Sequence, residues 1–349
     1  MSYDFTSIDQ PFSNQIELDG KTYLYFGGTA YLGLPKNRDF IELYVEGVKR
    51  YGLNNGTSRN NNIQLGIYDE AEQVAADRFG SENALIISSG YLAAQLAIQT
   101  LSSYGKVRYS PVSHPALWLN TALDFSAATF ADWKDETVEL INHSDESNWV
   151  LISNSMNNLF PEIFNFEFIS LIDVKKKLIL IVDDSHGIGI NNNGLGAIAK
   201  IPSRINTEVV VVASMAKALG VDAGIVLGSR FIISKLKESP IFSGASPPSA
   251  AGMYAFVHAS EIYIDALQKL RSNRDQFKRQ ISTGWQYETE FPVFLVNSPG
   301  IDRELLKENI LISSFPYPYK NSPTLNRIVL SSWHTDENID QLLAVLAKK

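Results

Sequence analysis

Two uninterrupted apolar runs constrain the fold of this chain most: L-I-L-I-V at residues 178–182 and V-V-V-V at residues 209–212. Runs of this kind are typical of strands that are buried on both faces, as in a parallel sheet. Each run leads into a polar segment, D-D-S-H-G after the first and S-M-A-K after the second. Because open α/β sheets bind ligands at the carboxyl ends of their strands, we expect Asp183, His186 and Lys217 to lie at that edge.

Strand and helix patterns alternate between about residues 70 and 230. Helical spacing is found at 69–79 and 90–101, and strand patterns, besides the two apolar runs, are found at 83–89, 106–110, 128–131 and 149–154. This alternation predicts right-handed β-α-β units that form a mainly parallel sheet with helices on both faces, an α/β fold. After Arg230 the pattern changes to a helix at 249–263, short strands near 292–297, 310–313 and 327–331, and a helix at 336–347. We therefore expect a smaller α+β domain there.

Composition limits the classes of function. The length of 349 residues suggests about two domains, and 45% hydrophobic residues can form a substantial core. A net charge of −8 argues against a nucleic-acid partner. The absence of cysteine excludes disulfides and thiol catalysis. With neither an apolar signal core nor a run of membrane-spanning length, we expect a cytoplasmic protein without membrane association.

The polar groups at the strand ends suit pyridoxal 5′-phosphate (PLP). A lysine can form the Schiff base, an acid can keep the pyridine nitrogen protonated, and neighbouring groups can fix the ring. Asp183 and Asp184 are adjacent in a strand end, so their side chains should point to opposite sides. Asp183 and His186 could instead belong to a metal site, but no third ligand follows at a standard spacing, so we expect no metal.

The phosphate requires hydrogen-bond donors without much bulk. Ser89, Gly90 and Tyr91 open a helix directly after a strand, so backbone N–H groups and the positive helix end can hold the phosphate. An ordinary helix cap would use the same atoms. Lys217 has a similar alternative, because a lysine at a strand end is commonly a solvated surface charge.

Five segments, in order along the chain, resemble the α-oxoamine synthases, a branch of the fold-type I PLP-dependent enzymes that includes 8-amino-7-oxononanoate synthase and 2-amino-3-ketobutyrate CoA ligase. They are A-L-I-I-S-S-G-Y-L-A-A (84–94), Y-S-P-V-S-H-P-A-L-W (109–118), V-D-D-S-H-G-I-G (182–189), S-M-A-K-A-L-G (214–220) and N-R-I-V-L-S-S-W-H-T (326–335). Any one segment alone would be weak, but five in order are specific.

The resemblance implies a role for each matched residue. Lys217 carries the cofactor, Asp183 contacts the pyridine nitrogen, His186 hydrogen-bonds the phenolic oxygen and His114 stacks on the ring. The remaining contacts are Ser214 to the phosphate, Ser155 near the ring edge and Arg327 to the substrate carboxylate. His114 could instead cap the helix that starts at Pro115, and Arg327 could be an exposed strand residue.

The implied reaction joins an amino acid to an acyl-CoA, with loss of carbon dioxide in most family members. The resemblance also implies a homodimer with its active site between the subunits. A large PLP-binding domain would span residues 40–230, and a small domain would combine residues 1–39 with 231–349.

Several positions depart from the family pattern. Thr29 stands in place of an asparagine that helps to bind substrate, and Tyr68 replaces a histidine. The usual S-M-D-G-D is S-M-N-N-L here, which places Asn157 at its first acid, and Gly244 replaces a hydroxyl residue that reaches the partner subunit's cofactor. Three alternatives therefore stay open: an aminotransferase, a PLP-binding protein without turnover, and a serine acyl-hydrolase using S-M-A-K at 214–217, which lacks a following K-T-G.

Overall fold

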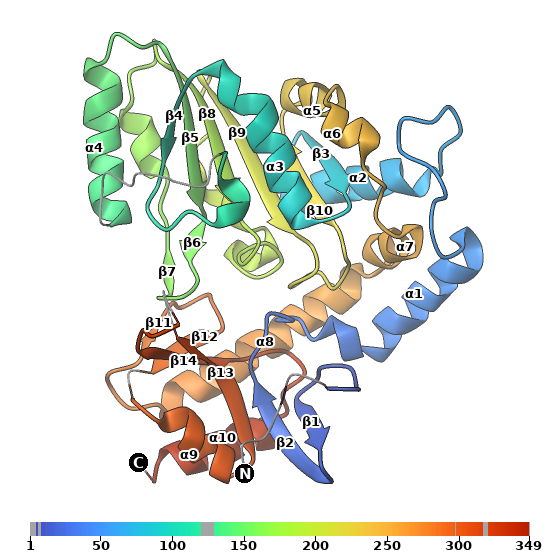
Figure 1. The fold of residues 1–349 in the computed structure, drawn as a ribbon, viewed down its shortest axis with the longest axis vertical. Coiled ribbons are helices and arrows are strands. Elements are labelled where there is room, and N and C mark those ends of the chain that lie inside the picture. Colours follow the sequence, from blue (N-terminus) through green and yellow to red (C-terminus); the bar gives the residue numbers. More distant parts are fainter. Residues whose placement is uncertain (1–4, 6–7, 120–128, 297, 317–319, 349) are drawn as a thin grey trace.

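The computed structural model describes residues 5, 8–119, 129–296, 298–316 and 320–348. Two six-stranded sheets form separate parts of the molecule, one in the upper half of Figure 1 and one in the lower half. Within the described ranges, none of the helices combines the length and the apolar character that crossing a membrane requires.

The upper sheet has the strand order β3-β10-β9-β8-β5-β4. The strands are β3 (Asn83–Ile87), β4 (Lys106–Tyr109), β5 (Asn148–Asn154), β8 (Lys177–Asp183), β9 (Thr207–Ser214) and β10 (Gly224–Gly228). The pairs β9–β8, β8–β5 and β5–β4 are parallel, whereas β10 runs antiparallel to both of its neighbours. The sheet is mainly parallel, as the sequence predicts.

Helices cover both faces of this sheet. Val210 and Val212 of β9 pack in a core that includes helices α3 (Gly90–Leu101) and α5 (Arg230–Lys237). The alternate residues Val211 and Ala213 pack in the core on the opposite face, which includes α2 (Ile67–Phe79) and α7 (Ala250–His258). The run of valines is thus buried on both faces, and the predicted α/β class is confirmed.

The lower sheet has the strand order β1-β2-β13-β14-β12-β11. The strands are β1 (Gln15–Leu18), β2 (Lys21–Phe26), β11 (Gln286–Tyr287), β12 (Val293–Val296), β13 (Ile310–Pro316) and β14 (Thr324–Val329). Strand β2 pairs in parallel with β13, so the N-terminal segment joins strands from the end of the chain. The division into domains at residues 40 and 230 remains a prediction.

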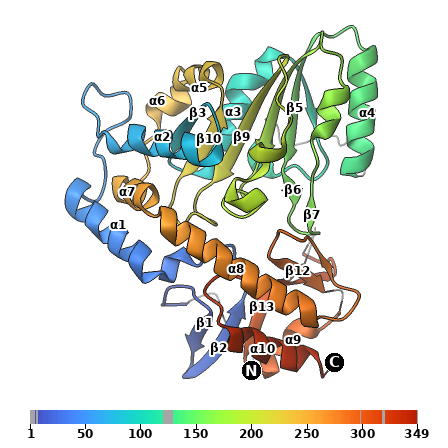
Figure 2. The same ribbon diagram turned by 180° about the vertical axis from the view of Figure 1, so that it is seen from behind.

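Further helices surround and connect the two sheets. They are α1 (Arg38–Tyr51), α4 (Phe130–His143), α6 (Pro240–Gly244), α8 (Ser260–Gln280), α9 (Ile301–Lys307) and α10 (Asp336–Leu346). Seen from behind in Figure 2, α8 runs diagonally between the two halves of the molecule. A short hairpin of β6 (Met156–Asn157) and β7 (Glu162–Ile163) follows β5 and points toward the lower half.

Two expected elements differ from the structure. The strand expected at 128–131 is wrong for its described residues, because Phe130 begins α4 and buries one face with Trp133 and Ile141 at helical spacing. The helix expected at 249–263 is two helices, α7 and α8, which meet at Ala259 (φ −94°, ψ 23°). Neither glycine nor proline marks that break in the sequence.

Candidate active site

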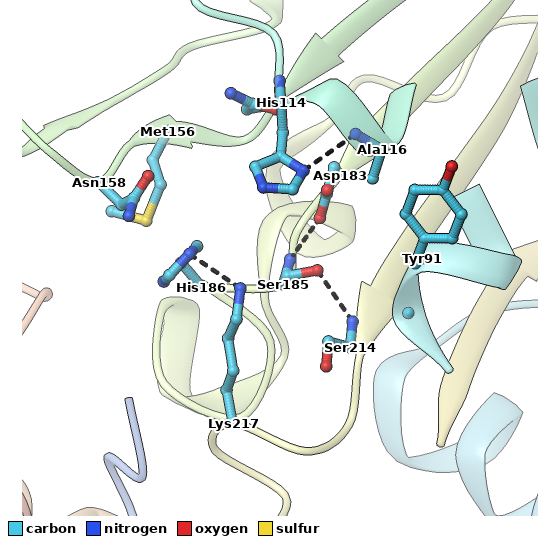
Figure 3. Close-up of a pocket in the computed structure, with 12 residues that line it drawn as sticks. Tyr91, His114, Ala116, Met156, Asn158, Asp183, Ser185, His186, Ser214 and Lys217 are labelled. Atoms are coloured by element: carbon cyan, nitrogen blue, oxygen red, sulfur yellow. Dashed lines mark hydrogen bonds between the residues drawn. The ribbon is translucent and has the colours of Figure 1, made fainter. Parts of the chain in front are cut away.

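Strands β3, β4, β5, β8 and β9 each lead into residues that line one cavity of about 110 Å³. The parallel strands end at the same edge of the sheet, so polar residues from distant parts of the sequence converge there (Figure 3). The lining residues are Gly90, Tyr91, His114, Ala116, Asn154, Met156, Asn158, Asp183, Ser185, His186, Ser214 and Lys217. Seven of the residues that the sequence singles out are therefore brought together: Gly90, Tyr91, His114, Asp183, His186, Ser214 and Lys217.

A hydrogen-bonded chain connects three of the buried polar groups. The Lys217 amine lies 2.9 Å from Nε2 of His186, and Nδ1 of His186 lies 2.8 Å from the Tyr31 hydroxyl. Tyr31 is fully buried, which raises the pKa of its phenol, so it keeps its proton and can donate to Nδ1. With Tyr31 as the donor to Nδ1, the proton of a neutral His186 lies on Nε2, the atom that contacts Lys217 (Figure 3).

Burial also favours the neutral forms of Lys217 and His186. Burial lowers the pKa of the Lys217 amine, and the nearby Asp183 carboxylate opposes this shift only in part. The pKa of the His186 imidazole is held well below its ordinary value by burial first and then by the positive charges of Lys217 and Arg327. A neutral amine beside a neutral imidazole is the state in which a lysine can act as a nucleophile or accept a proton.

The aspartate at the end of β8 is fixed by the next turn of the chain. Oδ1 of Asp183 accepts a hydrogen bond from the backbone N–H of Ser185 at 2.9 Å, and Oγ of Ser185 accepts one from the N–H of Ser214, also at 2.9 Å. This arrangement ties the end of β8 to the end of β9. Ser185 is a connecting residue that the sequence analysis missed, and its position in D-D-S-H was the only signal.

The start of α3 lies very close to the end of β9. A Cβ atom on Gly90 would come within 2.6 Å of Cα of Ser214, and one on Gly224 would come within 2.1 Å of the carbonyl oxygen of Ser89. The side chain of Ser89 accepts a hydrogen bond from Leu92 N–H at 3.2 Å and so caps the helix. Glycine at position 90 therefore allows the N-terminus of α3 to approach Ser214 closely. The free backbone N–H groups at that helix end are suited to binding a phosphate.

His114 caps a short helix, and its predicted stacking on the cofactor ring remains a prediction. Its Nδ1 accepts a hydrogen bond from Ala116 N–H at 3.1 Å, so it caps the short helix that starts at Pro115. The residue is exposed, and it lines the cavity together with Asp183 and His186 (Figure 3).

Ser155 does not line the cavity. It lies with Asp184 in a separate cavity of about 330 Å³ on the other side of the strand ends, where burial raises the pKa of the Asp184 carboxyl to about 7. The register explains the difference, because Asn154 of β5 pairs with Asp183 of β8 and the next residue of each strand points the opposite way. The predicted opposition of Asp183 and Asp184 is observed, and at the end of β5 Asn154 takes the place expected for Ser155.

Arg327 and Thr29 lie outside the set of lining residues. Arg327 on β14 is buried, and its Nε atom has no hydrogen-bond partner among the described residues. Its charge lowers the pKa of His186, which places the guanidinium within electrostatic range of the site. Thr29 is half-buried in the loop that leads to Tyr31.

The residues present fit PLP. A lysine whose pKa is lowered by burial can react with the aldehyde, the carboxylate of Asp183 can meet the pyridine nitrogen, and the helix start at Gly90 can hold the phosphate. Fold and pocket together define the class of fold-type I PLP-dependent transferases, which confirms the cofactor expected from the sequence. A sequence model of the aminotransferase class I and II family matches residues 24–346, so the chain belongs to that family.

Known proteins similar to this chain agree with that class. The chain is 24% identical to a putative 8-amino-7-oxononanoate synthase of Thermodesulfovibrio yellowstonii, over 95% of this chain and 89% of the relative. It is 25% identical to the 8-amino-7-oxononanoate synthase of Hahella chejuensis, over 98% and 91%. The resemblance to the α-oxoamine synthases is confirmed by these relatives.

Solved structures show the same fold. The serine palmitoyltransferase of Sphingomonas wittichii superposes with a TM-score of 0.79 at 16% identity, over 98% of this chain and 91% of that chain. The 8-amino-7-oxononanoate synthase of Francisella tularensis gives a TM-score of 0.71 at 18% identity, over 93% and 97%.

Proposed function

We propose that this protein is a PLP-dependent acyltransferase that joins an amino acid to an acyl-CoA. The observation that carries the proposal is the Lys217–His186 contact of 2.9 Å inside a pocket that fits PLP. The relatives named 8-amino-7-oxononanoate synthase, which match almost along their full length, support acyl transfer over other PLP reactions.

Each group in the site has a distinct task in this proposal. When bound, PLP withdraws electrons from the carbon next to the amino group of the substrate. Lys217, whose pKa is lowered by burial, can take the proton from that carbon. Asp183 would hold a proton at the pyridine nitrogen, and His186 would hydrogen-bond the phenolic oxygen. Arg327 binds the carboxylate of the amino acid, as a guanidinium does with two parallel hydrogen bonds.

The departures at the substrate positions affect which substrates are used. Thr29 has a hydroxyl where an amide is expected, and a hydroxyl cannot reproduce the paired donor and acceptor of an amide. Asn158 stands where the family pattern has glycine, and its side chain reaches the cavity (Figure 3). We therefore expect slow turnover or none with glycine or alanine, and faster turnover with another amino acid.

A thiol-release assay across a panel of amino acids and acyl-CoAs tests the proposal. Free CoA that depends on a particular amino acid is the expected result. Formation of pyridoxamine phosphate without thiol release would identify an aminotransferase instead. Neither signal from PLP-loaded protein would favour a PLP-binding protein without turnover.

We further propose that the protein is a homodimer whose active site lies between the subunits. Gly244 ends α6, and a Cβ atom there would meet nothing within 4 Å, so this position faces open space in the single chain. Tyr91 at the cavity is 62% exposed, which leaves room for a covering partner. A symmetric interface of the obligate kind commonly buries more than about 2,000 Å². Light scattering at micromolar concentration should give twice the mass of one chain, and a monomer with PLP bound would contradict this.

A further inference from the structure

We infer that Asn154 is a positioning residue, which holds the turn that carries His114 against the cofactor pocket. Its side-chain amide makes two hydrogen bonds to the backbone of that turn. Nδ2 donates to the carbonyl oxygen of Val112 at 2.8 Å, and Oδ1 accepts from the N–H of His114 at 3.1 Å. One amide thus spans Ser113 and fixes the backbone on both sides of it.

The turn needs to be held because its backbone is strained. Val112 has a φ of +54°, in the left-handed region that β-branched residues almost never adopt. Val112 is 46% exposed, so burial of its side chain does not explain this conformation. The hydrogen bond from Asn154 to the Val112 carbonyl instead opposes relaxation of the strained residue.

Serine hydroxyl groups also hold the same turn through hydrogen bonds. Oγ of Ser110 donates to Oγ of Ser153 at 2.8 Å, and Oγ of Ser113 donates to the carbonyl of Ser110 at 2.6 Å. These three serines are buried, and Ser153 immediately precedes Asn154 at the end of β5. The end of β5 therefore fixes the turn as a unit, and Asn154 alone among these groups both contacts His114 and lines the cavity.

The consequence concerns the His114 ring. Its Nδ1 accepts from Ala116 N–H, which leaves the proton on Nε2 and sets the ring plane relative to the turn. If Asn154 is removed, Val112 can relax and the turn moves with the ring. The inference rests on the proposed contact of His114 with PLP. The experiments below therefore test the role of Asn154 and the His114 contact separately.

Two measurements test the role of Asn154. In protein without cofactor, Asn154→Ala should increase amide hydrogen exchange across residues 112–116, because the N–H of His114 loses its acceptor. Titration of PLP, followed by its visible absorbance, should show about tenfold weaker binding, the loss expected from one or two hydrogen bonds. Asn158→Ala is the matched control, since it removes the same amide from the same cavity without a hydrogen bond to the turn among the described residues.

Two double variants make the result decisive. Val112→Gly removes the strain, because glycine adopts a positive φ freely. Added to Asn154→Ala, it should restore most of the lost PLP affinity. Added to Asn158→Ala, it should restore no affinity that this substitution has lost. In a His114→Ala background, Asn154→Ala should have no further effect on PLP affinity. An undiminished loss there, or no rescue by Val112→Gly, would overturn the positioning role. If His114→Ala alone leaves PLP affinity unchanged, the proposed contact of His114 with PLP fails instead.

Discussion

The cofactor pocket and the positions that face the substrate follow the family pattern to different degrees. In the pocket, Lys217, His186 and Asp183 occupy the expected places at the strand ends. On the substrate side, Thr29 and Asn158 replace an asparagine and a glycine. PLP makes the same demands in every enzyme that uses it, whereas each substrate requires its own contacts. The difference supports the proposal that the cofactor chemistry is retained while the substrate differs.

Among changes to the cofactor pocket, removal of Lys217 should lower turnover most. We expect Lys217→Ala to lower turnover at least about 10²–10⁴-fold, the typical contribution of a positioned acid–base group. The phosphate cradle at Gly90 should still bind PLP noncovalently. Lys175→Ala, which removes an exposed lysine in the turn before β8, should leave turnover unchanged. Thiol release under single-turnover conditions measures both variants.

The substrate side should respond most strongly at Arg327. Arg327→Ala removes a charge-assisted contact worth about 1.5–3 kcal/mol, so the KM of the amino acid should rise roughly 10- to 150-fold. The affinity for PLP should change little. Arg303, exposed on α9, provides the control substitution Arg303→Ala. An unchanged KM would remove Arg327 from the substrate site.

The adjacent carboxyl groups of Asp183 and Asp184 lie in different cavities, and only Asp183 lines the cofactor pocket. Asp184 has a pKa of about 7 in the folded protein and an ordinary value of 3.8, so the folded state binds more protons between these pH values. Its contribution to stability is present below about pH 4 and is lost as the pH rises through 7. Asp184→Asn should flatten this slope by up to about 1.4 kcal/mol per pH unit, measured by urea unfolding.

The matched substitution is Asp183→Asn in the same segment. It should weaken PLP binding, whereas Asp184→Asn should leave the affinity within about threefold, because only Asp183 lines the cavity. Equal losses of PLP affinity in the two variants would contradict the boundary drawn between the two carboxyls.

The smallest expected effect is a gain. Thr29→Asn restores the amide of the family pattern, so turnover with glycine or alanine should rise severalfold, in line with about 1 kcal/mol for one hydrogen bond. Thr29→Ser keeps a hydroxyl and should give no gain. If both variants behave alike, the altered substrate preference has its origin elsewhere in the site.

The sequence predicts well the site residues that lie at the ends of the buried strands. Asp183, His186 and Lys217 follow apolar runs that are typical of buried strands, and the ends of parallel strands meet at one edge. Tyr31 and Asn154 could not be predicted in this way. Tyr31 comes from the loop after β2, and an asparagine that hydrogen-bonds a distant turn leaves no periodic pattern.

Ser155 shows the limit of a matched motif. Its segment resembles the family segment, but side chains alternate along β5 and the turn after it, so a shift of one residue moves a side chain to the other side of the sheet. In this chain Asn154 faces the cofactor cavity and Ser155 faces Asp184. Only the register with β8 decides between them.

The most direct test of the account is borohydride reduction of the PLP-loaded protein, followed by peptide mapping. Reduction fixes PLP covalently on the lysine that carries it. We predict a single modified peptide, with the adduct on Lys217, and no adduct in Lys217→Ala. An adduct on another lysine, or none after loading with PLP, would contradict the central claim that this pocket holds PLP through Lys217.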